Sequence, residues 1–151
     1  MKIDNNQGFT LIEVLVVVII LGVLAAIAAP SWVNFINRQR VQAARGDVYR
    51  ALFNAQSIAK REKQNQAVTF TSTSYTAPQE GTQELDSNVT IQSVTDGSGS
   101  AMSTVTFDYE GTIVESNQIP ITVKLADQNG RYEYCVVVQT LLGAIQRTDC
   151  N

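Results

Sequence analysis

The chain has 151 residues, a formal net charge of −3 at pH 7 and no histidine. A chain of this length can hold one domain with an attached segment, but not two full cores. Histidine is the commonest general base and metal ligand, so its absence argues against most hydrolases and metal sites. The two cysteines, Cys135 and Cys150, lack the CxxC spacing of zinc sites and thioredoxin-like redox motifs. We therefore expect a protein without enzymatic activity, metal or cofactor.

The small net charge conceals a strong asymmetry along the chain. Residues 31–66 contain seven basic and two acidic residues, whereas residues 67–151 contain three basic and ten acidic residues. A basic segment therefore precedes an acidic domain. In an assembly, each part could attract the oppositely charged part of a neighbour.

The first 29 residues divide into a short polar leader, residues 1–8, and an apolar stretch, residues 9–29. As a helix, the apolar stretch would be about 32 Å long, close to the roughly 30 Å hydrocarbon core of a bilayer. Only Thr10 and Glu13 interrupt it. The sequence therefore predicts a membrane-spanning helical segment at residues 9–29.

Two simpler interpretations of this stretch remain. A secretory signal peptide would explain the small residues of Ala26-Ile27-Ala28, but the leader is weakly basic and Pro30 follows the supposed cleavage site almost at once. A plain single-span anchor would explain the apolar run but not Glu13. A carboxylate inside a membrane segment costs on the order of 2–3 kcal/mol, so it should have a partner or a function. Cleavage after Gly8 would create an α-amino group on Phe9, one helical turn before Glu13.

The string Gly8-Phe9-Thr10-Leu11-Ile12-Glu13 resembles the prepilin peptidase motif of type IV pilins and type II secretion pseudopilins. The resemblance implies cleavage between Gly8 and Phe9, N-methylation of Phe9, and an assembly role for Glu13 opposite the N-terminal amine of a neighbouring subunit. It also implies that Gly22 and Pro30 lie where the family has a helix-weakening glycine and a helix-kinking proline.

After Pro30 the helical pattern continues as an amphipathic half, residues 30–66. The apolar side chains recur every three or four residues and form one stripe: Val41, Ala44, Val48, Leu52, Ala55 and Ile58 or Ala59. Four arginines lie off the stripe: Arg38, Arg40, Arg45 and Arg50. We interpret them first as a solvated face, with lipid head groups or acidic partners as alternatives.

Residues 67–151 have the pattern of a β-rich globular domain. We expect strands near residues 68–71, 89–94, 104–107, 119–125 and 132–140, because these runs are rich in β-branched and aromatic residues. Asn129-Gly130 predicts a hairpin between the last two. Asp96–Ser100 reads as a flexible turn and not a calcium loop, and Glu80, Glu84 and Asp86 read as solvated loop carboxylates. The predicted fold is α+β and pilin-like, with one long helix packed on an antiparallel sheet.

Within the pilin-like proteins, the tail resembles the GspH/FimT-type minor pseudopilins. The similarity lies in Val105-Thr106-Phe107 leading to Gly111-Thr112-Ile113, and in Val136-Val137-Val138 followed by Gly143-Ala144-Ile145-Gln146-Arg147. Some members of that family bind DNA through an arginine-rich form of the last motif. Here only Arg147 remains in a domain with a net charge of −7, which makes nucleic acid a doubtful partner because DNA binding requires phosphate neutralisation.

The resemblance implies a subunit that is anchored once in the bacterial inner membrane, with its C-terminal domain in the periplasm, and is then taken into a pilus or pseudopilus. Its expected partners are prepilin peptidase, other pilin or pseudopilin subunits, the inner-membrane assembly platform and the lipid bilayer. In that oxidising location we favour a Cys135–Cys150 disulfide over two free thiols. The alternative function is a DNA- or surface-binding minor pilin that acts in DNA uptake or adhesion. Pilus and secretion system, and major and minor subunit, remain open.

Overall fold

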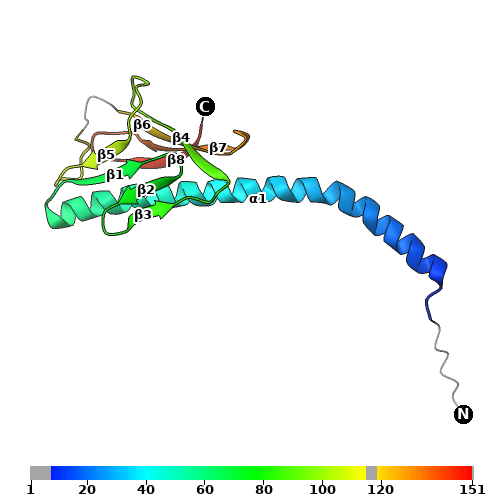
Figure 1. The fold of residues 1–151 in the computed structure, drawn as a ribbon. Helices are drawn as coiled ribbons and strands as arrows, with labels where there is room; N and C mark the ends of the chain where they lie inside the picture. Colours follow the sequence, from blue (N-terminus) through cyan, green and yellow to red (C-terminus); the bar gives the residue numbers. More distant parts are fainter. Residues whose placement is uncertain (1–7, 115–118, 151) are drawn as a thin grey trace, which may run out of the picture. The chain divides into compact units, whose positions relative to one another are not determined.

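The computed structural model describes residues 8–114 and 119–150, apart from the side chains of residues 29 and 30. The predicted leader therefore lies, except for Gly8, outside the described residues. The chain divides into two units, one ending at Ile36 and one beginning at Asn37. The helix α1 (Leu11–Glu62) contributes its first part to one unit and its last part to the other (Figure 1).

In the first unit, the side chains of α1 are exposed throughout the described part of the apolar stretch. Among the described residues, α1 is the single helix whose length and composition would allow it to cross a membrane. The helix is continuous through Gly22 and residue 30. A kink at Gly22 and Pro30 stays a prediction.

In the second unit, the predicted apolar stripe of α1 is buried. All of its members are between 0 and 7% exposed: Val41, Ala44, Val48, Leu52, Ala55, Ile58 and Ala59. The helix ends at Glu62, where Lys63 adopts a positive φ of 56° and turns the chain towards the first strand. This half of α1 is therefore held by packing of its apolar face and not by helix propensity alone.

The strands form two antiparallel four-stranded sheets. One has the order β3-β2-β1-β5 and is built from β1 (Gln66–Phe70), β2 (Ser74–Ala77), β3 (Gly81–Glu84) and β5 (Thr104–Phe107). The other has the order β4-β6-β7-β8 and is built from β4 (Val89–Thr95), β6 (Ile121–Asp127), β7 (Glu133–Val138) and β8 (Ile145–Asp149). The expectation of an antiparallel β-domain is confirmed.

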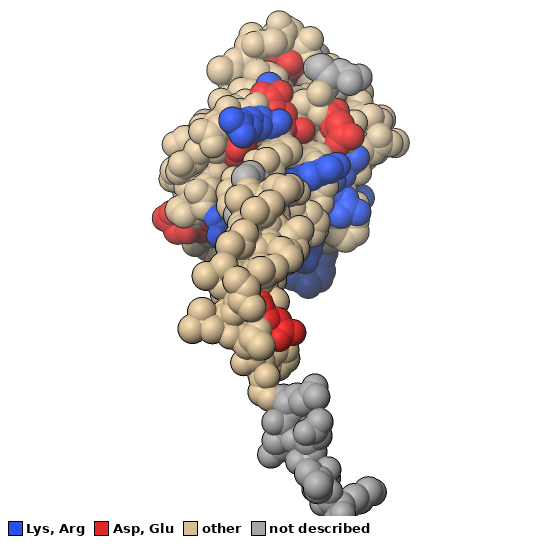
Figure 2. Space-filling view, turned by 90° about the vertical axis from the view of Figure 1, so that its right-hand side faces the viewer, with Lys and Arg blue, Asp and Glu red and all other residues tan. Residues whose placement is uncertain are grey.

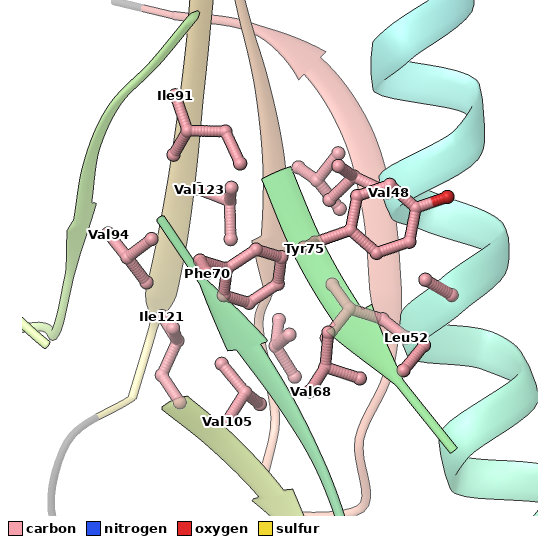
Figure 3. Packing of buried hydrophobic residues seen from close by; sticks show 14 of the residues in the cluster. Val48, Leu52, Val68, Phe70, Tyr75, Ile91, Val94, Val105, Ile121 and Val123 are labelled. Carbon is pink, nitrogen blue, oxygen red and sulfur yellow. The ribbon is translucent and has the colours of Figure 1, made fainter. Parts of the chain in front are cut away.

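The expectation of one sheet is wrong, because β4 pairs along its whole length with β6. Each sheet has one apolar face, and both faces must be removed from water together with the stripe of α1. Figure 3 shows the result: Leu52 of the helix, Phe70 of the first sheet and Val123 of the second meet in one core. The core therefore joins three layers and not two.

The structure also contains three strands that were not predicted, namely β2, β3 and β8. Glu84, expected in a loop, is the last residue of β3. The hairpin at Asn129-Gly130 is confirmed, since β6 pairs with β7 and Gly130, with a φ of +66°, donates its backbone N–H to the carbonyl oxygen of Asp127 at 2.9 Å.

Candidate functional site

The start of α1 is fixed by Thr10. Its carbonyl oxygen accepts the N–H of Val14 at 3.2 Å, and its side-chain hydroxyl oxygen accepts the N–H of Glu13 at 3.3 Å. Thr10 is thus the N-cap residue, and Glu13 occupies the third helical position of a T-x-x-E sequence pattern. Sequence reasoning missed this role of Thr10, although the T-x-x-E spacing is visible in the sequence.

Phe9 and Glu13 are one helical turn apart and line a shallow groove together with Val14, Val17 and Val18. Phe9 is 81% exposed, and Gly8 before it is exposed as well. Glu13 is the one charged side chain between residues 9 and 36. Figure 2 shows this part of the surface as almost wholly uncharged, with the basic groups gathered on the globular unit. The geometry presents a lone carboxylate on an apolar helix, in the same groove as Phe9.

The first arginines of the amphipathic half contact the β-domain. Arg38 donates its Nε–H to the hydroxyl oxygen of Tyr134 at 2.9 Å, and this bond raises the pKa of the guanidinium above its usual value. Gln42 donates to the same oxygen at 3.1 Å. The guanidinium of Arg45 lies 4.5 Å above the centre of the Tyr134 ring. Tyr134 of β7 is therefore held by three side chains of α1.

Arg45 also reaches the C-terminal strand. It donates to the carbonyl oxygen of Thr148 at 3.2 Å and lies 3.7 Å from the carboxylate of Asp149, with only 19% of its side chain exposed. The interpretation of the arginines as a solvated face is wrong for Arg45, because its guanidinium packs on a ring and on a strand. Arg50 remains on the surface, where it pairs with Asp47.

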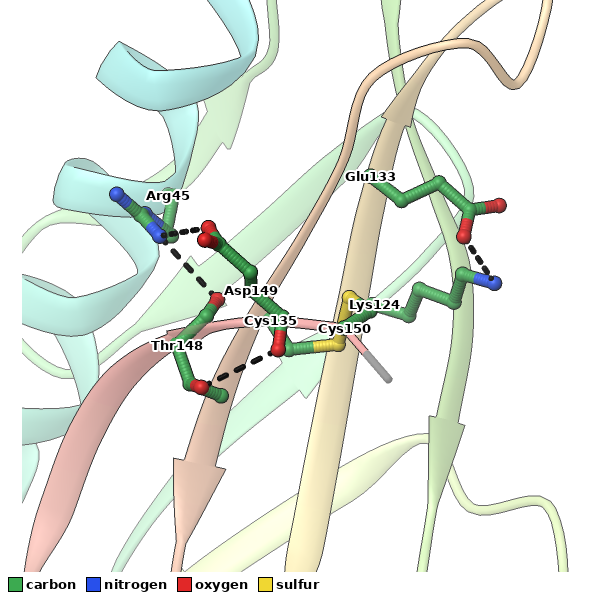
Figure 4. The surroundings of a disulfide bond; sticks show 7 residues. All are labelled: Arg45, Lys124, Glu133, Cys135, Thr148, Asp149 and Cys150. Atoms are coloured by element: carbon green, nitrogen blue, oxygen red, sulfur yellow. Dashed lines mark hydrogen bonds and ion pairs between the residues drawn. A yellow bond between two sulfur atoms is a disulfide. The ribbon is translucent and has the colours of Figure 1, made fainter.

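A disulfide joins Cys135 of β7 to Cys150, which follows β8, with their Cα atoms 5.2 Å apart (Figure 4). Opposite Cys135 in the register of the two strands is Thr148. β8 is therefore fixed by its pairing with β7, by the disulfide and by Arg45. The pairing and the disulfide hold the C-terminal segment on β7, and Arg45 holds it against the helix.

Gln56 brings together the two tail motifs that the sequence singled out. It is 8% exposed, and its Nε2 donates to the carbonyl oxygens of Gly111 at 2.8 Å and Leu142 at 2.9 Å. The backbone N–H of Ile113 donates to the carbonyl oxygen of Leu141 at 2.9 Å and joins the same two loops. The signal for Gln56 was a polar residue beside the apolar stripe, and sequence reasoning did not use it.

The carboxylates considered as possible chemistry have separate structural partners. Glu80 accepts a hydrogen bond from Asn54 at 2.9 Å, and Asp86 lies 3.6 Å from Arg40. Asp96 accepts the hydroxyl and the backbone N–H of Ser98, at 2.7 and 2.9 Å, and these bonds lower the pKa of its carboxyl. Within residues 8–114 and 119–150, no three or more Asp, Glu or Cys side chains gather as a metal site would require.

Residues 3–29 match the family described as the prokaryotic N-terminal methylation motif. A fimbrial protein of Pseudomonas aeruginosa is 33% identical to this chain over 108 residues, which is 72% of this chain and 64% of that protein. The fold is similar to that of the type IV minor pilin FimU of P. aeruginosa, with a TM-score of 0.57 and 18% identity over 75% of this chain and 91% of FimU. It is also similar to the minor pseudopilin EpsH from the type 2 secretion system of Vibrio cholerae, with a TM-score of 0.54 and 12% identity over 73% of this chain and 97% of EpsH.

The matched region spans 26% of the length of one curated relative and 64% of another, and the structural neighbours show the fold alone. Three independent features nevertheless agree. The methylation motif covers the Gly8–Phe9 junction, the fimbrial relative matches most of the chain, and the long helix packs on antiparallel sheets as in FimU and EpsH. The chain is therefore similar to the type IV pilin-like proteins in its N-terminal motif, and its fold is that of the minor pilins and pseudopilins.

Proposed function

We propose that this chain is a structural subunit, a minor pilin or pseudopilin, of a type IV pilus or a type II secretion pseudopilus. It inserts in the inner membrane through residues 9–29 and is cut by prepilin peptidase between Gly8 and Phe9. Phe9 is then N-methylated, and the assembly platform extracts the chain into a filament of pilin subunits. The observation that carries this proposal is the lone carboxylate of Glu13, one turn from Phe9 on an exposed apolar helix.

The chemistry of that carboxylate supports assembly through the helix. Between packed apolar helices, two opposite charges attract strongly, and either one without its partner is penalised. An amine on Phe9 of one subunit placed opposite Glu13 of the next would satisfy both charges. Because both groups lie at the start of α1, the pair would also set the axial register between neighbouring helices.

The Cys135–Cys150 disulfide supports export of the C-terminal domain. Disulfides form and persist in the periplasm or outside the cell and are rare in the cytoplasm. With a single span, the disulfide supports a periplasmic location of the domain before assembly. We do not extend the proposal to DNA binding. Arg147, the remaining arginine of the DNA-binding pattern, lies on the ring of Tyr49, and the domain is acidic.

The proposal is tested by mass spectrometry of the chain from membranes and from sheared filaments of the bacterium that makes it. We expect assembled chains to begin at N-methylated Phe9, and Glu13→Ala to stay in the membrane fraction but to disappear from filaments. Protease added to spheroplasts should remove the C-terminal domain. Assembled chains that retain residues 1–8, or that begin at Ala29, would overturn the proposal.

A further inference from the structure

One groove of the globular unit brings together two arginines from distant parts of the chain. Arg38 comes from the first turn of α1 within this unit, and Arg131 comes from the turn between β6 and β7. Figure 2 shows basic side chains gathered on this unit. The same groove also contains two tyrosines and two carboxylates, namely Tyr132, Tyr134, Glu133 and Asp149.

The two carboxylates of the groove have cations of their own. Glu133 lies 2.8 Å from the amine of Lys124, and Asp149 lies 3.7 Å from the guanidinium of Arg45 (Figure 4). Within the part of the chain that the structure describes, neither of the groove's two arginines has a carboxylate within ion-pair distance. The groove therefore holds two cations without an ion-pair partner and favours an anionic ligand.

Both arginines are positioned by other contacts, which leave guanidinium N–H groups available. The Nε–H of Arg38 donates to the hydroxyl oxygen of Tyr134 at 2.9 Å, and this is the one hydrogen bond of the Arg38 side chain to residues 8–114 and 119–150. The backbone N–H of Arg131 donates to the carboxylate of Asp127, which is 2% exposed, at 2.6 Å and so fixes the turn. A guanidinium matches the geometry of phosphate and binds it through two parallel hydrogen bonds. Phosphate is therefore the anion that this groove suits best.

The position of Arg38 along α1 indicates the source of such a phosphate. No charged residue lies between Glu13 and Arg38. Near the end of this uncharged run, Trp32 is 67% exposed, and tryptophan rings are enriched at the membrane–water interface. Arg38 follows Trp32 by six residues, about 9 Å along a helix axis, and long arginine side chains reach back over such distances towards the interface. In the anchored chain, the phosphates of the bilayer surface are thus the anions nearest to the groove.

We propose that Arg38 and Arg131 bind the phosphate group of an anionic phospholipid while the chain is anchored in the membrane. The two cations favour a lipid with net negative charge over a zwitterionic lipid, because the ammonium group of the latter would be repelled by them. The bound lipid holds this groove at the bilayer surface and is released when the chain is extracted. The inference deepens the proposed function and rests on its membrane-anchored stage.

The test is native mass spectrometry of the full-length chain in detergent micelles, with equal amounts of phosphatidylglycerol and phosphatidylcholine of the same acyl chains added. We expect the chain to retain phosphatidylglycerol in preference to phosphatidylcholine. Arg38→Gln and Arg131→Gln should each lower the retained phosphatidylglycerol about fivefold, the effect of one basic residue beside an anionic membrane surface. Arg61→Gln is the matched control, since it removes the same charge near the C-terminal end of α1, where Arg61 lies 3.4 Å from Glu62.

The Tm of each variant in the same detergent monitors folding. If Arg38→Gln unfolds, Arg131→Gln decides the test, because the Arg131 side chain has no ion pair to lose within the described residues.

Three results would overturn the inference while the proposed function stands. They are equal retention of the two lipids by the wild-type chain, equal losses in Arg131→Gln and Arg61→Gln, and displacement of the lipid by an equal concentration of inorganic phosphate, which would make the groove a site for free phosphate. If the wild-type chain never reaches the membrane fraction or the filaments of its host, the proposed function has failed, and this inference fails with it.

Discussion

The side-chain amide of Gln56 donates a hydrogen bond of 2.8 Å to the carbonyl oxygen of Gly111, 55 residues further along the chain. The same nitrogen donates to the carbonyl oxygen of Leu142. Because these carbonyls belong to two different loops, one helix residue sets the position of both. The loop after β7 carries the exposed Leu142, and Gln56 holds the backbone of this loop at that residue.

We expect Gln56→Leu to lower the free energy of unfolding by about 1–3 kcal/mol, because two backbone carbonyl oxygens lose their donor. The measurement is urea unfolding of the detergent-solubilised full chain, followed by circular dichroism. Ser57→Ala is the control, since Ser57 is exposed and its hydroxyl donates to the carbonyl oxygen of Phe53 in its own helix. Equal urea midpoints for Gln56→Leu and Ser57→Ala would show that the Gln56 amide contributes nothing to the stability of the fold.

Two glycine-to-alanine substitutions should change the stability of the fold in opposite directions. Gly143 has a φ of +73°, and a β-carbon there would lie 2.9 Å from the carbonyl oxygen of Gly111 and would collide with Gln56. Gly143→Ala should destabilise the fold by at least about 1–2 kcal/mol, the cost of a left-handed conformation for a residue with a side chain. Gly46→Ala, in open space on a helix, should stabilise it by about 0.5–1 kcal/mol. Thermal unfolding of the two variants checks both signs, and shifts of the same sign would contradict this assignment.

The elements that the sequence predicted well are those with a strong local pattern. The buried stripe of α1 has a helical period, and the β6–β7 hairpin has Asn129-Gly130 between two apolar runs. Both signals are independent of what the segment packs against. The apolar stretch before Pro30, with its single acid, is equally local, and the cleavage between Gly8 and Phe9 that it suggests stays a prediction.

The elements that were missed depend on tertiary context. All residues of β3 and all but the first of β8 are exposed, so their strand state comes from pairing with β2 and β7 and not from apolar alternation. The division into two sheets and the packing of Arg45 on Tyr134 also depend on tertiary contacts. These features arise from contacts between segments far apart in the chain, which no local pattern records.

The disulfide should contribute about 3 kcal/mol, the chain-entropy value for a loop of about 15 residues, which is the separation of Cys135 and Cys150. We expect a reducing agent to lower the Tm of the wild-type chain. The double variant Cys135→Ala with Cys150→Ala should have the lower Tm from the start and should not respond to reductant. Quantitative thiol labelling of the unreduced native chain would be incompatible with the bond.

Asp108 should make stability depend on pH. Its carboxylate accepts the hydroxyl of Thr112 at 2.7 Å and the backbone N–H groups of Thr112 and Glu110, each at 2.9 Å, which lower its pKa in the folded chain. A lowered folded pKa means that the stabilisation is present above the unfolded value of about 4 and is lost as the pH falls through the folded value. The urea midpoint should therefore fall less steeply below about pH 4 in Asp108→Asn than in the wild-type chain. Glu110→Gln, on an exposed side chain of the same turn, is the control, and parallel curves for wild type and Asp108→Asn would contradict the expectation.

The proposed role of Glu13 as a charge in assembly can be separated from its place in the N-terminal cap of α1. Glu13→Gln keeps a side chain that suits the third position of a capping box but removes the negative charge, whereas Thr10→Ala removes the hydroxyl acceptor and keeps the carboxylate. If the charge pairs with an amine on Phe9 of a neighbour, Glu13→Gln should insert in the membrane and be lost from sheared filaments. Thr10→Ala, which loses about 1 kcal/mol of helix stability, should still assemble. If Glu13→Gln instead enters filaments and Thr10→Ala does not, then assembly depends on the helix cap and not on the charge of Glu13.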